Sequence, residues 1–152
     1  MLACSLYNWA DMSPDTELPP AAIDPEQLGP LLVAWQRRSG RQDLPWQRDR
    51  SAYRVWVSEI MLQQTQVSTV IGYFERFMAR FPTVSALGEA PIDEVLHLWT
   101  GLGYYARARN LHRAAKDLYE RNQCTIPDEW KALRKLPGVG DYIAAAVLSI
   151  AF

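Results

Sequence analysis

The sequence contains little cysteine and histidine, with two of each among 152 residues. Cys4 and Cys124 are far apart and share no metal-ligand spacing, and neither His97 nor His112 has neighbours that would complete a ligand set. We therefore expect no metal site in the chain, and reduced thiols in a cytoplasmic protein. The first ten residues lack the basic and apolar segments of a signal peptide, and no apolar run is long enough to span a membrane.

The sequence also lacks a strong net charge. It has 16 basic and 17 acidic residues, giving −1, so composition alone does not indicate a nucleic-acid partner. The charges are unevenly distributed, because five acidic residues and no basic residue precede Leu31. The remainder is mildly positive, which is compatible with phosphate binding and equally with an ordinary solvated surface.

Alternating strand patterns are absent, and apolar residues recur with helical spacing, so we predict an all-α fold. Residues 1–24 read as a loose leader, residues 25–43 as an N-terminal helix and connector, and residues 44–152 as a six-helix module. The expected helices cover residues 25–38, 51–63, 66–81, 84–88, 92–98, about 106–122, 128–134 and from 141 onward, with an extended connector at 43–46.

The stretch Leu136-Pro137-Gly138-Val139-Gly140 separates a polar helical segment from an Ala-rich helix. Gly138 and Gly140 permit a sharp turn between these helices and let the loop amides approach a phosphate closely. An ordinary helix–helix turn is the alternative. The flanking helices favour a helix-hairpin-helix that grips the DNA backbone without reading its sequence.

Glu59 lies in a mostly apolar helical segment, Val55 to Leu62, and no cation occurs three or four positions away. A carboxyl group near apolar surface has a raised pKa and can serve as a general acid near neutral pH. A solvated residue on an amphipathic helix is an equally good interpretation of Glu59 alone.

Two further segments carry groups suited to contact nucleic-acid bases. Gln63, Gln64 and Thr65 interrupt an apolar pattern at a helix boundary, where capping is the alternative to reading base edges. Leu102 and Tyr104 lie on a glycine-flanked loop, where large side chains either pack inward or insert between bases.

A cluster of arginines follows that loop. Arg107, Arg109 and Arg113 begin the next helix, and Arg109 and Arg113 are four positions apart. This concentration of positive charge could neutralise DNA phosphates, and a solvated helix face is the alternative.

The sequence closely resembles the adenine DNA glycosylases (MutY type) of the helix-hairpin-helix superfamily. The resemblance is carried by the glycine hairpin and by three segments, Leu44 to Trp46, Trp56 to Val67 and Leu98 to Arg107. The resemblance runs from about Leu31 to the C-terminus. It implies a base-excision repair enzyme that removes adenine mispaired with 8-oxoguanine or guanine in double-stranded DNA, acting as a monomer.

The resemblance also implies roles for individual residues. Glu59 would protonate the flipped adenine, Trp46 would wall its pocket, and Tyr142 would assist near the sugar. The related endonuclease III-type lyases carry lysine where this chain has Tyr142, so the resemblance implies a monofunctional glycosylase. The remaining implied DNA contacts are Gln64, Thr65, Leu102 and Tyr104 at the opposing 8-oxoguanine, and the loop Gly138–Gly140 on the backbone.

Some family features have no counterpart in the sequence. The family's catalytic aspartate, the four cysteines that ligate a 4Fe-4S cluster and a C-terminal domain lie beyond the matched region, and Asp141 reads as a helix cap and not as that aspartate. We therefore expect a truncated chain whose helix 25–38 leaves its apolar face exposed, with weak DNA binding and slow or absent cleavage. A thymine-mismatch glycosylase and a noncatalytic DNA-binding module are the alternatives.

Overall fold

The computed structural model describes residues 25–41 and 43–152, so the predicted leader 1–24 lies outside the described residues. The chain divides into two compact units between Arg41 and Gln42. The first unit contains helix α1 (Pro25–Ser39), which has Glu26 in its first turn and Arg37 and Arg38 in its last turn, in the sense that complements the helix dipole. Within this unit, apolar side chains such as Trp35 are exposed.

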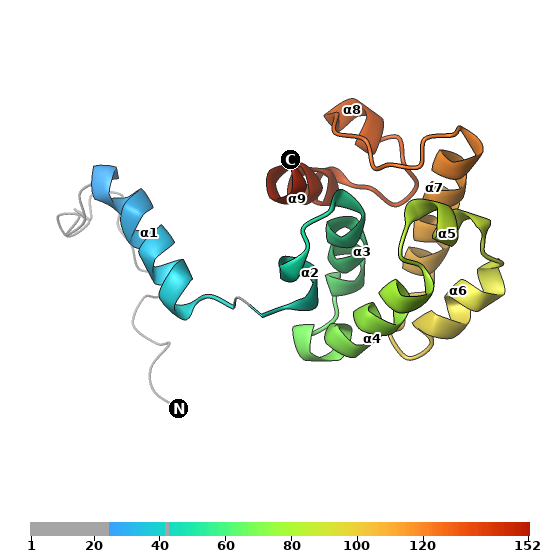
Figure 1. Ribbon diagram of the computed structural model, residues 1–152, viewed down its shortest axis with the longest axis horizontal. Coiled ribbons are helices and arrows are strands. Elements are labelled where there is room, and N and C mark those ends of the chain that lie inside the picture. The colour runs from blue at the N-terminus through green and yellow to red at the C-terminus, as the bar shows by residue number, and fades with distance from the viewer. Residues whose placement is uncertain (1–24, 42) are drawn as a thin grey trace, which may run out of the picture. The chain divides into compact units, whose positions relative to one another are not determined.

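The second unit is built from helices, and the described residues contain no strand, which confirms the all-α prediction. No helix among the described residues of either unit has the length and apolarity required to cross a membrane. The helices, drawn in Figure 1, are α2 (Pro45–Arg48), α3 (Ala52–Leu62), α4 (Val67–Arg80), α5 (Val84–Glu89), α6 (Ile92–Trp99), α7 (Ala106–Glu120), α8 (Trp130–Leu133) and α9 (Asp141–Ala151).

Two short elements differ from the sequence prediction. The connector at 43–46 is extended only as far as Leu44, because Pro45 occupies the first position of α2, where its missing N–H is not needed. The first helix of the hairpin is reduced to the single turn α8, and residues 128–129 remain outside it.

Helix α3 forms the centre of the core. Trp56, Val57 and Met61 are completely buried, and α3 packs against α4, α7 and α9 (Figure 1). Tyr53 at its start is anchored by its hydroxyl, which donates to the carbonyl of Phe81 at 2.9 Å.

The hairpin between α8 and α9 contains a tight turn. The Val139 N–H donates to the Leu136 carbonyl at 3.1 Å, and Gly138 at the third position has φ +78°, the geometry of a type II turn with Pro137 at its second position. A Cβ on Gly138 would lie 2.8 Å from Asn110 Cβ on α7, so the turn also packs tightly against that helix.

Arg134 ties the two ends of the hairpin together. Its guanidinium pairs with the Asp141 carboxylate (Nε–Oδ1 2.6 Å) and donates to the Val139 carbonyl at 2.6 Å. The expected capping role of Asp141 is therefore wrong, because the cap position of α9 is Gly140 and the Asp141 side chain is used in this ion pair. Gly140 itself has an ordinary φ of −82° and is not required by the backbone conformation.

Candidate functional site

The centre of the site is the Glu59 carboxyl group on α3. It is half-buried, and desolvation raises its pKa above the ordinary value, while a hydrogen bond from the Tyr142 hydroxyl opposes part of that rise. Tyr142 lies in the first turn of α9 and is 71% exposed. The packing of α9 on α3 thus brings together two residues that are far apart in sequence.

Glu59 and Trp46 line a common pocket of about 250 Å³. This volume is slightly below the range for drug-sized ligands and suits a single flat heterocycle. Trp46 is buried and makes an edge-on contact with Phe74 (ring centroids 5.3 Å apart), so its indole is a fixed part of the wall. The remaining lining residues are Gln47, Arg50, Val55, Ser58 and Ile150.

The sequence interpretation missed four polar or distant members of this pocket. Ser58 could have been inferred from its position next to Glu59, and Gln47 and Arg50 from their position after the Leu-Pro-Trp motif. Ile150 carries no such signal, because only the docking of α9 brings it to the pocket. Gln47 has a buried side-chain carbonyl oxygen with no hydrogen-bond partner among the described residues, an unusual state for a buried acceptor.

A second concave region lies between the loop after α3 and the loop before α7. It has a volume of about 500 Å³ and is lined by Gln63, Gln64, Tyr104, Ala106 and Arg107. Gln64 (φ +56°) and Tyr104 (φ +49°) both adopt the left-handed backbone conformation, which costs a non-glycine residue free energy and is found preferentially at functional sites. Both side chains are exposed, so they remain suited to contact a base.

Two predicted DNA contacts have other surroundings. Leu102 is only 6% exposed and packs inward, so its side chain is not placed to insert between bases. The Arg107 guanidinium points into its own protein, where it donates to several backbone carbonyls, and it is not presented to a phosphate. Burial explains why the Arg107 pKa is lowered, although it remains a cation.

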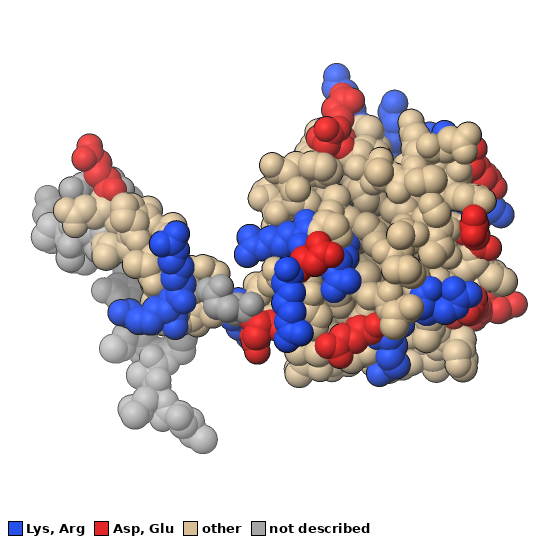
Figure 2. All heavy atoms as spheres, in the orientation of Figure 1, with Lys and Arg blue, Asp and Glu red and all other residues tan. Residues whose placement is uncertain are grey.

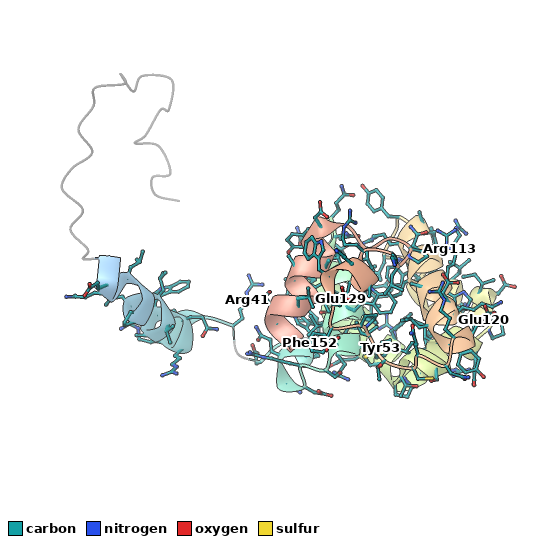
Figure 3. The ribbon with its side chains drawn as sticks, turned by 90° about the horizontal axis from the view of Figure 1, so that it is seen from above. Arg41, Tyr53, Arg113, Glu120, Glu129 and Phe152 are labelled. Carbon is teal, nitrogen blue, oxygen red and sulfur yellow. The ribbon has the colours of Figure 1, made fainter. Side chains whose placement is uncertain are left out.

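The rest of the arginine cluster faces outward. Arg109 and Arg113 are exposed and line a groove of about 400 Å³ on α7, and Arg113 donates to the Asn110 side chain at 3.0 Å. Figure 3 shows Arg113 and Glu120 along the outer side of α7. Because Asn110 touches the turn at Gly138, this groove adjoins the hairpin.

The hairpin offers fewer phosphate ligands than its sequence suggested. The Val139 side chain is buried and its N–H is used within the turn, so this residue is not a free donor. The space around Gly140 is open, since no described atom lies within 4 Å of the position where a Cβ would stand. A phosphate could therefore approach the backbone near Gly140 and the start of α9.

Figure 2 shows basic and acidic side chains interspersed over the face of the second unit turned to the viewer. The described residues contain no cluster of three or more His, Cys, Asp or Glu residues that could hold a metal ion. With two cysteines in all, the chain cannot supply the four thiolates that a 4Fe-4S cluster requires.

Comparisons with known proteins agree with this arrangement. Residues 57–139 match the family described as HhH-GPD superfamily base excision DNA repair protein. The chain is 46% identical over 121 residues to an adenine DNA glycosylase of Buchnera aphidicola subsp. Baizongia pistaciae, covering 80% of this chain and 34% of that protein. It is 47% identical over 130 residues to the human adenine DNA glycosylase, covering 80% of this chain and 24% of that protein.

The fold is similar to those of solved DNA glycosylases. A thermostable thymine-DNA glycosylase matches with a TM-score of 0.72 and 27% identity, covering 80% of this chain and 56% of that chain. An endonuclease III in a non-covalent DNA complex matches with a TM-score of 0.67 and 22% identity, covering 86% and 61%. The chain thus spans about a third or less of the length of the curated relatives named above.

Proposed function

Because this chain belongs to the HhH-GPD superfamily of base excision DNA repair proteins, we propose that it carries the base-binding and proton-donating part of an adenine DNA glycosylase. The proposed substrate is adenine mispaired with 8-oxoguanine or guanine in double-stranded DNA, bound by a monomer. One observation carries the proposal: a half-buried carboxyl group with a raised pKa shares a pocket with a fixed indole wall.

The pocket is too small for a stacked base pair, so the adenine must leave the duplex and enter alone. Trp46 offers an aromatic wall to the base, and the protonated Glu59 carboxyl donates its proton to a ring nitrogen. The glycosidic C–N bond then breaks, and its electron pair leaves with the protonated base as neutral adenine. The raised pKa favours this step, because it keeps a larger fraction of Glu59 protonated near neutral pH than an ordinary carboxyl group would have.

The step leaves an oxocarbenium-like sugar and an ionised Glu59. The ionised Glu59 carboxylate and the neighbouring Tyr142 hydroxyl would stabilise this positive charge. Water then adds to the sugar and its proton returns to Glu59, so the overall reaction is hydrolysis. Tyr142 has no amine and cannot form a Schiff base, which favours hydrolysis without strand cleavage.

Recognition of the opposing base is assigned to the second concave region. Gln64 and Tyr104, which line it with Gln63, would probe the base opposite the adenine, and Thr65 belongs to the same loop as Gln64. Arg109 and Arg113 with the Gly138–Gly140 backbone would bind phosphates.

Adenine release under single-turnover conditions, with protein in excess over a duplex containing A:8-oxoguanine, tests the proposal. We expect slow release that falls roughly 10²–10⁴-fold in Glu59→Gln, while duplex binding is retained. Glu75→Gln, which changes an exposed glutamate on α4, is the matched control and should behave as the unmodified chain.

Three results would contradict the proposal. An unchanged rate of adenine release in Glu59→Gln would show that Glu59 is not the proton donor. Faster release of thymine from T:G than of adenine would favour the thymine-mismatch alternative. Absence of both release and preferential binding to the A:8-oxoguanine duplex would leave only a noncatalytic DNA-binding module.

A further inference from the structure

The Arg107 side chain is a junction between two loops that are distant in sequence. We call residues 63–65, which follow α3, the first loop, and residues 102–104, which precede α7, the second loop. One nitrogen of the guanidinium, Nη1, donates to the carbonyls of Ile60 (3.0 Å), Met61 (2.9 Å) and Gln63. These carbonyls belong to the C-terminal end of α3, where the helix leaves acceptors without internal partners.

The other nitrogen, Nη2, reaches both loops. It donates to the Thr65 hydroxyl (3.2 Å) in the first loop and to the carbonyls of Leu102 (3.2 Å) and Gly103 (3.3 Å) in the second. The guanidinium therefore connects the end of α3, the first loop and the second loop through a single planar group. Only arginine provides several donors in such a fixed plane, and a lysine ammonium could not reach all these acceptors at once.

Aromatic contacts complete the arrangement. The guanidinium carbon lies 5.6 Å from the ring centroid of buried Trp99 and 5.4 Å from that of exposed Tyr104, within the range of cation–π interactions. Trp99 in turn donates its indole N–H to the Gly103 carbonyl at 3.2 Å. Arg107 thus contacts the second loop in two ways, through the loop's backbone carbonyls and through the ring of Tyr104, the most exposed residue of that loop.

Each loop presents one exposed side chain on a left-handed backbone, Gln64 in the first and Tyr104 in the second. A non-glycine residue keeps this conformation only when its surroundings enforce it. The Arg107 contacts lie on both sides of Gln64, at the Gln63 carbonyl and the Thr65 hydroxyl, and immediately before Tyr104, at the Gly103 carbonyl. Arg107 therefore contacts both loops next to their left-handed residues, together with the Thr65 N–H bond to the Leu62 carbonyl and the Trp99 bond to Gly103.

We propose that Arg107 is a positioning residue that holds Gln64 and Tyr104 at a fixed separation, so that both can enter the base stack at a mismatch, and that it contacts no phosphate. This inference rests on the proposed function, because it assigns the two side chains to recognition of the opposing base. It predicts that loss of the Arg107 fork weakens discrimination between mismatched and matched DNA more than it weakens binding in general.

The first test compares Arg107→Lys with Arg109→Lys, the same conservative change two residues further along α7. Binding to duplexes with A:8-oxoguanine and with A:T is measured by fluorescence anisotropy. We expect the ratio of the two dissociation constants to fall about tenfold in Arg107→Lys, which corresponds to about 1.4 kcal/mol, and to be unchanged in Arg109→Lys. An unchanged ratio in Arg107→Lys would overturn the proposal.

The salt dependence separates positioning from phosphate binding. A protein that loses one phosphate contact shows a slope of log K against log salt that is smaller by about 0.9. We expect this decrease in Arg109→Gln and not in Arg107→Gln. A decrease of that size in Arg107→Gln would show that its guanidinium neutralises a phosphate and would overturn the proposal.

Hydrogen exchange in the free protein provides a readout that needs no DNA. Arg107→Lys should accelerate exchange of the amides in residues 63–65 and 102–104 together, and Arg109→Lys should not. If the Arg107 variants fail to fold, Thr65→Val removes one acceptor of the guanidinium and should accelerate exchange in residues 102–104, across the junction. Unchanged exchange in residues 102–104 would overturn the positioning role. If exchange in the two loops responds as expected but the unmodified chain shows no preference for mismatched DNA, the proposed function is overturned and the positioning role is not.

Discussion

Replacement of Tyr142 by phenylalanine gives the most direct test of the acid. The Tyr142 hydroxyl donates to the Glu59 carboxylate and lowers its pKa, against the larger effect of desolvation that raises it. The substitution removes the hydrogen bond and leaves the ring, so the Glu59 pKa should rise further above its usual value of about 4.3.

The size of the shift follows from the exposure of the pair. A hydrogen bond to a charged group contributes about 1.5–3 kcal/mol where both partners are shielded from water. Tyr142 is 71% exposed and Glu59 only half-buried, so solvent screening reduces this to about 1 kcal/mol or less. We therefore expect a further rise of the Glu59 pKa in Tyr142→Phe that reflects only this small free energy.

The sign for stability follows from proton binding. The folded-state pKa of Glu59 lies above its unfolded value, so the native state binds more protons in that interval and stability falls as pH rises through it. In Tyr142→Phe, the decrease in stability should therefore continue to higher pH. In the same way, the high-pH limb of adenine release should move to higher pH, because the acid stays protonated longer.

Titration of the Glu59 carboxyl carbon by NMR in the free protein measures the shift directly. Tyr105→Phe, at an exposed tyrosine just before α7, is the matched control and should leave the Glu59 titration unchanged. A Glu59 pKa at or below the ordinary glutamate value, or a downward shift in Tyr142→Phe, would refute the argument that desolvation dominates this carboxyl group.

Two further predictions concern the hairpin, and both are measured by urea denaturation. Gly138→Ala should destabilise the protein by about 1–3 kcal/mol, because Gly138 has φ +78° and the new Cβ would lie 2.8 Å from Asn110 Cβ. Gly140→Ala is the control and should cost no more than about 1 kcal/mol, because Gly140 has an ordinary φ and open space around it. Equal costs at the two positions would contradict the assigned turn. Asp141→Asn should cost about 0–1 kcal/mol, because the pair with Arg134 is largely exposed, and less at high salt; a loss that does not respond to salt would show that the ion pair is not its cause.

The sequence was sufficient for the fold because helical periodicity is local. Apolar spacing and flanking prolines located α3 to α7 within two residues of their observed ends. It was less informative for single-turn elements. Helix α2 has four residues, too few for a periodic pattern, and only the position of Pro45 indicated where it begins.

The site was predictable where a residue type implies its chemistry and unpredictable where orientation decides. Glu59 was selected by residue type and context and Trp46 by the family resemblance, and both line one pocket. Arg107 was interpreted as a DNA contact from the concentration of positive charge and Leu102 from the family resemblance. The Arg107 guanidinium instead donates to backbone carbonyls, and the Leu102 side chain is buried. The sequence pattern of one helix does not reveal that backbone carbonyls at the end of another helix lie within reach as hydrogen-bond acceptors.

The dependence of the pocket on α9 separates inactivation from unfolding. Helix α9 contributes Tyr142 beside the acid and Ile150 to the lining, while α3, α4 and α7 have mutual contacts that do not require it. A brief local detachment of α9 would open the wall and leave Glu59 in water with its ordinary acidity, although the remaining helices stay assembled. Proton donation therefore depends on the packing of α9 against α3 and not only on the integrity of α3, which carries the acid.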